Sequence, residues 1–334
     1  MKKHKICKIL LVILAIFLCV AFYELLGICV AYKKQPEVSN TTKKETKNGS
    51  WNECSENTER AVIIEKNPEA LLQRVRLIKN AKKEIILSTF AFQSDESGKL
   101  ILGALHDAAD RGVHIRLLVD GMESWIDMEG NPYFYGLSSH ENVEIKLYNK
   151  ANPLKPWKMM GRMHDKYLIA DGKRYILGGR NTYNYFLGDF PGHKNYDRDV
   201  LVVCDEPEKE NSVNQLLEYF ETIWEQEDSG YFHDNKKLAN RKSVKNAVLE
   251  LQNGYQKYFE ENKERICDTD YTDETFETEK IALVSNPIHT GPKEPVVWYQ
   301  LGELMKNAKE RVKIHTPYII CNDMMYNTWK EIAE

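Results

Sequence analysis

Paired cysteines are missing from this sequence of 334 residues, which contains no C-x-x-C arrangement. A structural zinc site or a disulfide framework shows as cysteines at short, regular spacings, so neither is indicated. Three of the cysteines lie in the apolar N-terminal stretch, where cysteine behaves as a small apolar residue. No other cluster of metal ligands stands out, and we expect no metal ion or other cofactor. The seven cysteines are Cys7, Cys19, Cys29, Cys54, Cys204, Cys267 and Cys321.

An excess of basic residues is also missing, because 46 lysines and arginines stand against 50 aspartates and glutamates. The formal net charge is −4 and the pI is near 6.2. Nucleic acid backbone is usually held by a broad basic field, so we expect no nucleic-acid partner and only a local anion site. A hydrophobic content of 42% with 29% charged residues argues against disorder and suffices for one large domain or two modest ones.

One long apolar run is present, over residues 9–32, and only Glu24 interrupts it. It is long enough to span a bilayer as a helix, and the lysines before it predict that the N-terminus stays inside. We therefore expect residues 1–34 to form a single membrane anchor, with the rest on the extracytoplasmic side. A cleaved signal sequence is the alternative, because residues 29–31 read Cys-Val-Ala, a small-x-small site. Residues 35–60 are polar and predict a flexible linker.

Helical and strand patterns alternate from residue 61 onward, which is typical of the α/β class. Asp171-Gly172 lies between two apolar runs and predicts a tight hairpin. We expect a first domain over 61–233, and a charged, helical connector over 234–280. The expected helices are 68–81, 98–111 and 210–224, and the expected strands are 84–92, 113–120, 143–148 and 200–204.

Two distant stretches of the sequence resemble each other and indicate an internal repeat. Residues 306–316, KNAKERVKIHT, resemble residues 79–89, KNAKKEIILST, at an offset of 227 positions. Each stretch reads as the end of a helix that runs into a strand, so residues 281–334 are expected to begin a second copy of the domain. The same offset carries residue 164 to position 391, which lies beyond the sequence. The second copy is therefore expected to be truncated before any motif of its own, unless the repeat is a chance similarity.

The most informative run is His164-x-Lys166-x4-Asp171, followed by Gly178-Gly179-x-Asn181. Residues two apart on a strand point to the same face about 7 Å apart, so His164 and Lys166 can grip one phosphate from two sides.

Phosphoester transfer needs a nucleophile and a group that neutralises the phosphate oxygens, and this run can supply both. A neutral His164 imidazole can attack phosphorus to give a phosphohistidine, while Lys166 offsets the developing charge. Gly178 and Gly179 let the backbone approach closely, and Asn181 offers an amide and the N-terminus of a helix.

This pattern resembles the HKD motif of the phospholipase D superfamily. The longer stretch over 161–186, with Tyr-Asp-Arg-Asp-Val at 196–200, is most similar to the bacterial cardiolipin-synthase-like branch. The resemblance implies an α/β/α sandwich with a mixed sheet, here preceded by a transmembrane helix. Thr316-Pro317-Tyr318 is similar to the run that opens the second half of these enzymes.

Residue roles follow from the resemblance alone. It implies that His164 is the nucleophile, that Lys166 and Asn181 bind phosphate, and that Asp171 is a structural member of the motif. An acidic residue before the next strand orients the histidine in this family, and Asp197 fits that place, with Asp199 as the alternative. Gly179 stands where many members have serine.

The second HKD motif of the family is not in this sequence. Its histidine would protonate the leaving alcohol and its lysine would complete the phosphate clamp. Three hypotheses follow: a membrane-anchored phosphatidyltransferase or phosphodiesterase of the cardiolipin-synthase type, a nuclease-type phosphodiesterase, and an inactive truncated remnant. A homodimer could restore the second motif in short relatives. It is not indicated here, because the partial second half would occupy the partner's place.

A basic stretch next to the motif bears on the substrate. Between residues 146 and 166, six basic residues stand against Asp165 alone and alternate with Trp157, Met159 and Met160. Such a loop suits the headgroups of anionic lipids, and a merely solvated loop is the alternative. With the anchor, it favours a phospholipid such as phosphatidylglycerol as substrate and a membrane as partner; hydrolysis and transfer both stay open. The six basic residues are Lys146, Lys150, Lys155, Lys158, Arg162 and Lys166.

Overall fold

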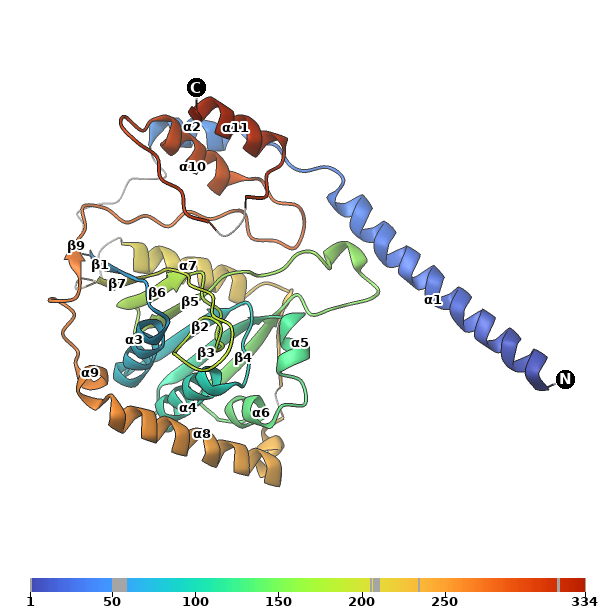
Figure 1. Ribbon diagram of the computed structural model, residues 1–334, viewed down its shortest axis with the longest axis horizontal. Coiled ribbons are helices and arrows are strands. Elements are labelled where there is room, and N and C mark those ends of the chain that lie inside the picture. The colour runs from blue at the N-terminus through green and yellow to red at the C-terminus, as the bar shows by residue number, and fades with distance from the viewer. Residues whose placement is uncertain are drawn as a thin grey trace. The chain divides into compact units, whose positions relative to one another are not determined.

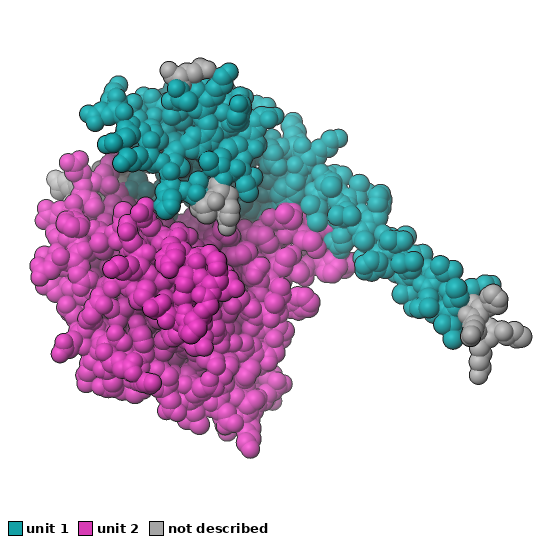
Figure 2. Space-filling view, viewed as in Figure 1, with its two compact units in different colours: residues 1–53, 282–334 teal, residues 54–281 magenta. Residues whose placement is uncertain are grey.

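The computed structural model describes residues 2–49, 59–204, 206, 211–233, 235–316 and 319–333. The chain forms two compact units, one of residues 1–53 and 282–334 and the other of residues 54–281 (Figure 2). Of the residues singled out above, Cys54, Pro317 and Tyr318, and the expected start of a helix at residue 210, lie outside the described residues.

The larger unit is built on a mixed sheet, as expected (Figure 1). The described strands follow the order β8-β4-β3-β2-β5-β6-β7-β1-β9, in which β2, β3 and β4 are parallel and the other neighbours antiparallel. The strands are β1 (Glu59–Ile64), β2 (Glu84–Thr89), β3 (His114–Asp120), β4 (Val143–Tyr148), β5 (Tyr167–Ala170), β6 (Arg174–Gly178), β7 (Asp199–Cys204), β8 (Ser229–Tyr231) and β9 (Phe276–Glu277).

Helices cover both faces of this sheet and complete the α/β/α sandwich. In Figure 1, α7 lies on one face, and α3, α4, α6 and α8 lie on the other. Strands covered on both faces bury side chains on both sides, as the consecutive buried residues Leu117, Leu118 and Val119 of β3 do. The helices are α3 (Asn67–Asn80), α4 (Glu96–Asp110), α5 (Glu123–Asp127), α6 (Pro132–Ser138), α7 (Ser212–Trp224), α8 (Lys242–Glu261) and α9 (Lys263–Cys267), with short 3₁₀ turns η2 (Pro156–Lys158) and η3 (Lys236–Asn240).

The β5–β6 hairpin turns at Asp171-Gly172, which confirms the predicted turn. Both residues have positive φ, 55° and 62°, and the Lys173 N–H closes the turn on the Ala170 carbonyl at 3.0 Å. The hairpin places β5 antiparallel to β2, with Tyr167 opposite Ser88. The residues just before β5 therefore lie where β2 ends.

The described residues 235–280 are part of the larger unit, whereas the sequence predicted a charged, helical connector over 234–280. Helix α8 packs on α4 and α6 through an apolar stripe that includes Leu251, Tyr255 and Phe259. A Cβ at Gly103 would lie 2.7 Å from the Leu251 carbonyl oxygen, so α4 and α8 approach backbone to backbone. The sequence reads as charged because only this stripe is apolar, and one stripe suffices to bury a helix.

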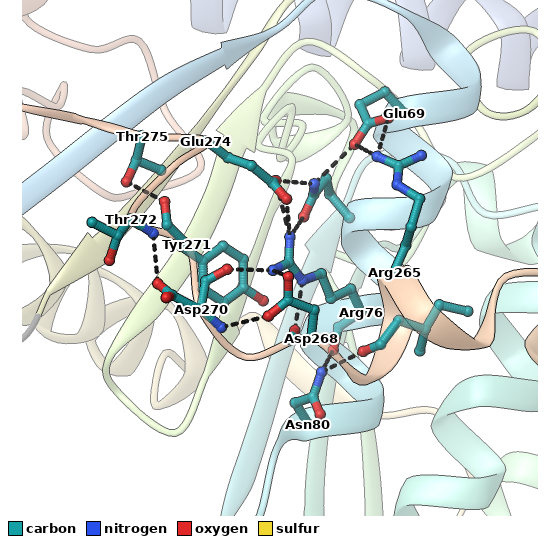
Figure 3. A network of polar contacts seen from close by, with 12 residues as sticks. Glu69, Arg76, Asn80, Arg265, Asp268, Asp270, Tyr271, Thr272, Glu274 and Thr275 are labelled. Carbon is teal, nitrogen blue, oxygen red and sulfur yellow. Dashed lines mark hydrogen bonds and ion pairs between the residues drawn. The ribbon is translucent and has the colours of Figure 1, made fainter.

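A polar network fastens the end of this region to α3 (Figure 3). The Arg76 guanidinium pairs with Glu274 at 2.9 Å, donates to the Asp268 and Asp270 carbonyls at 2.8 and 2.7 Å, and lies 3.9 Å from the centre of the Tyr271 ring. Because Arg76 is only 1% exposed, these partners are needed to stabilise its charge. The network leads the chain to β9, which pairs with β1.

The smaller unit contains α1 (Lys2–Tyr32), α2 (Asn40–Asn48), α10 (Val296–Lys306) and α11 (Asp323–Ala333). Within α1, the stretch Lys5–Tyr32 is long and apolar enough to cross a membrane. Helix α2 lies in the predicted flexible linker and is capped by Ser39, whose hydroxyl accepts from the Thr42 N–H at 3.1 Å. The linker is thus partly helical, because its Ser-Asn-Thr-Thr run suits a helix start.

The strand expected after residue 306 is not formed in the described residues 308–316. In the first copy, β2 is paired on both sides, by β3 and β5. A strand needs such partners to satisfy its backbone, and local sequence similarity does not supply them. The second copy of the domain remains an expectation from the sequence.

Candidate active site

The residues of the motif lie at one edge of the larger unit's sheet, where the parallel strands β2, β3 and β4 have their carboxyl ends. His164 precedes β5 at this edge, and Lys166 follows it immediately before the strand. The segment after β2 lies beside the segment after β6, since Phe92 bridges to Thr182 and the Gln93 N–H donates to the Thr182 carbonyl at 3.2 Å. Ligands of α/β sheets bind at such edges.

His164 is exposed, and its ring stacks at an angle against Phe90, with ring centres 4.7 Å apart. Partial burial and the nearby charge of Lys166 lower the pKa of the imidazole below its ordinary value. The ring is therefore neutral at pH 7, and a neutral imidazole has the lone pair that a nucleophile needs.

Lys166 is buried, at 5% exposure, and its Nζ donates to the His164 carbonyl at 2.6 Å. Burial lowers the pKa of its ammonium group to about 8, against the opposing effect of Asp165, Asp197 and Asp120. The group remains mostly protonated at pH 7. It is a positive charge held in a poorly solvated place, where charge interactions are strong.

Gly178 and Gly179 make room for acidic residues. A Cβ at Gly178 would lie 2.1 Å from Asp199 Oδ1, and one at Gly179 would lie 2.1 Å from Asp197 Oδ2. Any larger residue would push these carboxylates away. The sequence led us to expect a close approach to phosphate, whereas the close approach in the structure is to the two aspartates.

Asn181 is buried, and its Oδ1 accepts the Ala91 N–H at 3.2 Å. This bond fixes which end of the amide faces the segment after β2. The expected helix start at Asn181 is wrong, because residues 183–188 form turns and bends. The phosphate ligand at this position would therefore be the amide NH₂ group alone.

The two candidate orienting aspartates have different surroundings. Asp199 is fully buried between Arg74 and Arg180, at 2.9 and 3.2 Å, so its charge is already matched. Asp197 is half-buried and lies against Gly179. Its negative charge opposes the lowering of the Lys166 pKa by burial. No hydrogen bond joins the His164 ring to either carboxylate in this described part of the chain. The orienting role of Asp197 stays a prediction.

Asp171 lies at the opposite end of β5 from His164. Its carboxylate accepts the backbone N–H groups of Lys82, Lys83 and Glu84 at 2.7 to 3.1 Å. It thereby ties the hairpin to the start of β2, and this geometry fits a structural member of the motif. It does not reach the phosphate site.

Asp120 also belongs to the site, although no motif in the sequence marks it. It ends β3, is fully buried, and accepts the Met163 N–H at 3.0 Å, immediately before His164. Its carboxylate also pairs with Arg162 at 3.3 Å. Burial raises its pKa, which the Arg162 charge and the backbone donors oppose. Its place at the carboxyl end of a parallel strand was the signal that could have found it.

Asp165, which lies between His164 and Lys166, is fixed by a hydrogen bond. The Tyr219 hydroxyl of α7 donates to Asp165 Oδ2 at 2.7 Å, and burial raises the pKa of that hydroxyl. Tyr219 therefore stays protonated and acts as a fixed donor. Throughout the described ranges, no three His, Cys, Asp or Glu side chains come together to hold a metal ion.

The matching family model and one of the curated relatives both carry the name cardiolipin synthase. Residues 74–224 match the family model described as "Cardiolipin synthase, PLD-like domain". The chain is 28% identical over 298 residues to an uncharacterized protein of Helicobacter pylori, covering 81% of this chain and 56% of that protein. It is 29% identical over 171 residues to cardiolipin synthase C of Escherichia coli, covering 47% of this chain and 34% of that enzyme.

The fold has a solved counterpart. The structure of phosphatidylserine synthase from Haemophilus influenzae matches with a TM-score of 0.58 at 16% identity, covering 88% of this chain and 64% of that one. At this identity the match concerns the fold alone. The chain spans about half the length of the first curated relatives that it matches, 56% and 54%.

Proposed function

Because residues 74–224 of this chain belong to the phospholipase D superfamily, in its cardiolipin-synthase-like branch, we propose that the protein is a membrane-anchored phosphatidyltransferase or phosphodiesterase. The observation that carries the proposal is the pair His164 and Lys166 at the sheet edge. One is a neutral imidazole and the other a buried cation, and they lie two residues apart immediately before β5. That combination is what an attack on a phosphodiester requires.

The reaction would proceed in two displacements. A nitrogen of His164 attacks phosphorus, a P–N bond forms, and the P–O bond to the leaving alcohol breaks. Lys166 and the Asn181 amide offset the charge on the non-bridging oxygens. An incoming alcohol or water then attacks phosphorus and releases His164. The leaving alkoxide needs a proton, and the resemblance assigns that role to the histidine of a second motif.

A phospholipid is the proposed substrate, with phosphatidylglycerol as the first candidate. Relatives named cardiolipin synthase support this class, and so does the apolar helix over Lys5–Tyr32. We propose that this helix is an uncleaved single-pass anchor with the domain on the extracytoplasmic side.

The test is turnover of phosphatidylglycerol by the full chain reconstituted into vesicles. We expect cardiolipin or phosphatidic acid to form, and ³²P from the lipid phosphate to be trapped on the protein as an acid-labile, base-stable phosphatidyl-histidine. His164→Ala should lower turnover by about 10³-fold or more, because it removes the nucleophile. His114→Ala is the control, since His114 lies at the other end of β3 and is half-exposed. Unchanged turnover in His164→Ala would rule out the proposed nucleophile.

A further inference from the structure

We propose that two loops beside the site form a surface that docks onto anionic membrane lipid. The inference rests on the proposed function, because it concerns how a lipid substrate reaches His164. The loops are α5, after β3, and residues 150–162, after β4. We call their exposed apolar side chains the docking surface, and they are Trp125, Ile126, Leu154, Trp157 and Met160.

Exposure is the first observation. Trp125 and Ile126 are 68% and 69% exposed, and Leu154 is 78% exposed. Trp157 and Met160 follow at 46% and 56%. Single exposed apolar residues are normal on a protein surface, but five large ones on two neighbouring loops mark an interaction site.

The two loops adjoin each other. They follow neighbouring parallel strands, and the Gly121 N–H donates to the Tyr148 carbonyl at 2.7 Å, where β3 and β4 end. Met122, before α5, lines a cavity of about 200 Å³ together with Lys155 and Met159 of the other loop. The apolar side chains thus belong to one region of the surface.

The same loops are joined to the nucleophile. Asp120 accepts the Met122 N–H at 2.9 Å and the Met163 N–H at 3.0 Å, so one carboxylate holds both loops next to His164. The Asn149 amide donates to the Lys158 and Gly161 carbonyls at 2.7 and 2.8 Å, which closes the base of the second loop. A surface so held would present lipid at a fixed height relative to His164.

Charge identifies the kind of lipid. Of the six basic residues predicted to form a basic loop, Lys158 and Arg162 are paired with Asp228 and Asp120. Lys146 donates to the Trp224 carbonyl, and Lys166 is buried.

Two exposed lysines remain. Lys155 has no carboxylate partner in the described ranges, and Lys150 donates to the Tyr231 carbonyl at 2.7 Å. The acidic side chains of α5, Glu123 and Asp127, are half-buried, whereas Glu129 after α5 and Glu227 of the shared cavity are exposed. Lysines around exposed tryptophan and aliphatic side chains are typical of surfaces that enter an anionic bilayer interface.

The first measurement is the depth of the two tryptophans. The full chain is reconstituted into phosphatidylglycerol vesicles with or without brominated acyl chains, and tryptophan fluorescence is recorded. Because Lys5–Tyr32 is expected to keep the chain on the vesicle in every variant, quenching reports insertion of the loops. We expect bromolipid quenching that decreases in Trp125→Phe and in Trp157→Phe, and that is weaker in phosphatidylcholine vesicles.

The second measurement separates docking from chemistry. Ile126→Ser with Leu154→Ser should lower turnover of vesicle phosphatidylglycerol by about tenfold, because the inserted apolar area is lost. Turnover of dihexanoyl phosphatidylglycerol below its micellar concentration should stay within about twofold. Leu249→Ser is the matched control, since Leu249 is 58% exposed on α8, away from the site edge.

Each possible outcome of these two measurements supports or overturns the docking surface. Absence of bromolipid quenching, equal quenching by neutral lipid, or an equal loss on both substrates would overturn docking on anionic lipid. So would protection of both tryptophans by a bound protein in place of lipid. If the wild type turns over neither substrate while Trp125 and Trp157 are quenched, the proposed function fails and the docking surface stands.

Discussion

His164 and Lys166 both have lowered pKa values, yet the effect on their charges is opposite. A lowered pKa keeps an imidazole neutral at pH 7, whereas a lysine lowered to about 8 is still mostly protonated. Burial is the main cause for both, and their mutual repulsion adds to it at His164. A window of pH therefore exists in which the nucleophile is free and the phosphate-binding cation is charged.

This window predicts a bell-shaped pH profile of kcat/KM, which reports the free enzyme. Below the lowered pKa of His164 the ring gains a proton and activity falls, so the acid limb lies below 6.5. Above about 8 Lys166 loses its proton and activity falls again. The profile is measured with a water-soluble phosphodiester, so that lipid titration does not contribute. In Lys166→Arg the alkaline limb should disappear, because arginine stays charged; its persistence would assign the limb to another group.

The glycines at 178 and 179 have a structural reason that the motif itself does not reveal. The glycine pair resembles the family motif, but its physical reason, the carboxylates of Asp197 and Asp199, lies some 18 to 21 positions further along the chain. No local pattern reports that approach. The same holds for Asp120, whose contact with Met163 spans 43 positions.

At the scale of elements, the pairing of β6 with β7 brings Gly178 and Gly179 close to residues 197–199, the acidic segment. Gly178 pairs with Asp199, and the buried trio of Arg74, Asp199 and Arg180 holds the ends of these strands to α3. Removing one member of a buried charge trio leaves an uncompensated charge in the interior, which is strongly destabilising. A shift in the pairing of β6 with β7 would separate the trio, so the trio favours the observed register. The acidic segment is thereby kept against the motif.

Gly179→Ala is predicted to destabilise the protein by about 1 to 3 kcal/mol, because a methyl group there meets Asp197 at 2.1 Å. The measurement is the urea midpoint of unfolding. Gly254→Ala is the matched control: Gly254 lies inside α8 with nothing within 4 Å of a new Cβ, so the change should stabilise by about 1 kcal/mol. Equal, stabilising effects of both changes would show that Asp197 does not approach Gly179.

Strand and helix positions were largely readable from local sequence. The strand at Val143–Tyr148 was predicted at its observed bounds, and α3 and α4 within two residues at either end. The short α5, the edge strands β8 and β9 and the packing of α8 were not predicted. Two- and three-residue strands have no periodicity to detect, and a charged amphipathic helix does not reveal which surface it covers.

At the scale of the whole molecule, the larger unit is bounded by its packing. Helix α8 and the network around Arg76 place residues 234–281 in the unit that holds the site. The apolar surface of α4 and α6 that α8 covers would otherwise meet water. The predicted boundary at residue 233 therefore divides a packed core.

Two fragments test this boundary. Residues 54–281 are predicted to express as a soluble fragment with one cooperative unfolding transition, because the core cluster lies within them. A fragment of residues 54–233 should aggregate or bind the dye ANS, since it exposes the surface that Leu251, Tyr255 and Phe259 cover. Equal solubility and equal melting of the two fragments would contradict the observed packing of α8.

The sequence by itself determined the α/β class, the apolar helix at the N-terminus and the motif at His164, because each is written in neighbouring residues. It also pointed to the phospholipase D superfamily, which the comparisons confirm. Only the tertiary structure decided which acids meet the motif, that five of the six basic residues have a carboxylate or carbonyl partner, and that exposed apolar side chains gather on the segments after β3 and β4. The reason is physical: charge state and exposure depend on groups far away in sequence, which only folding brings together.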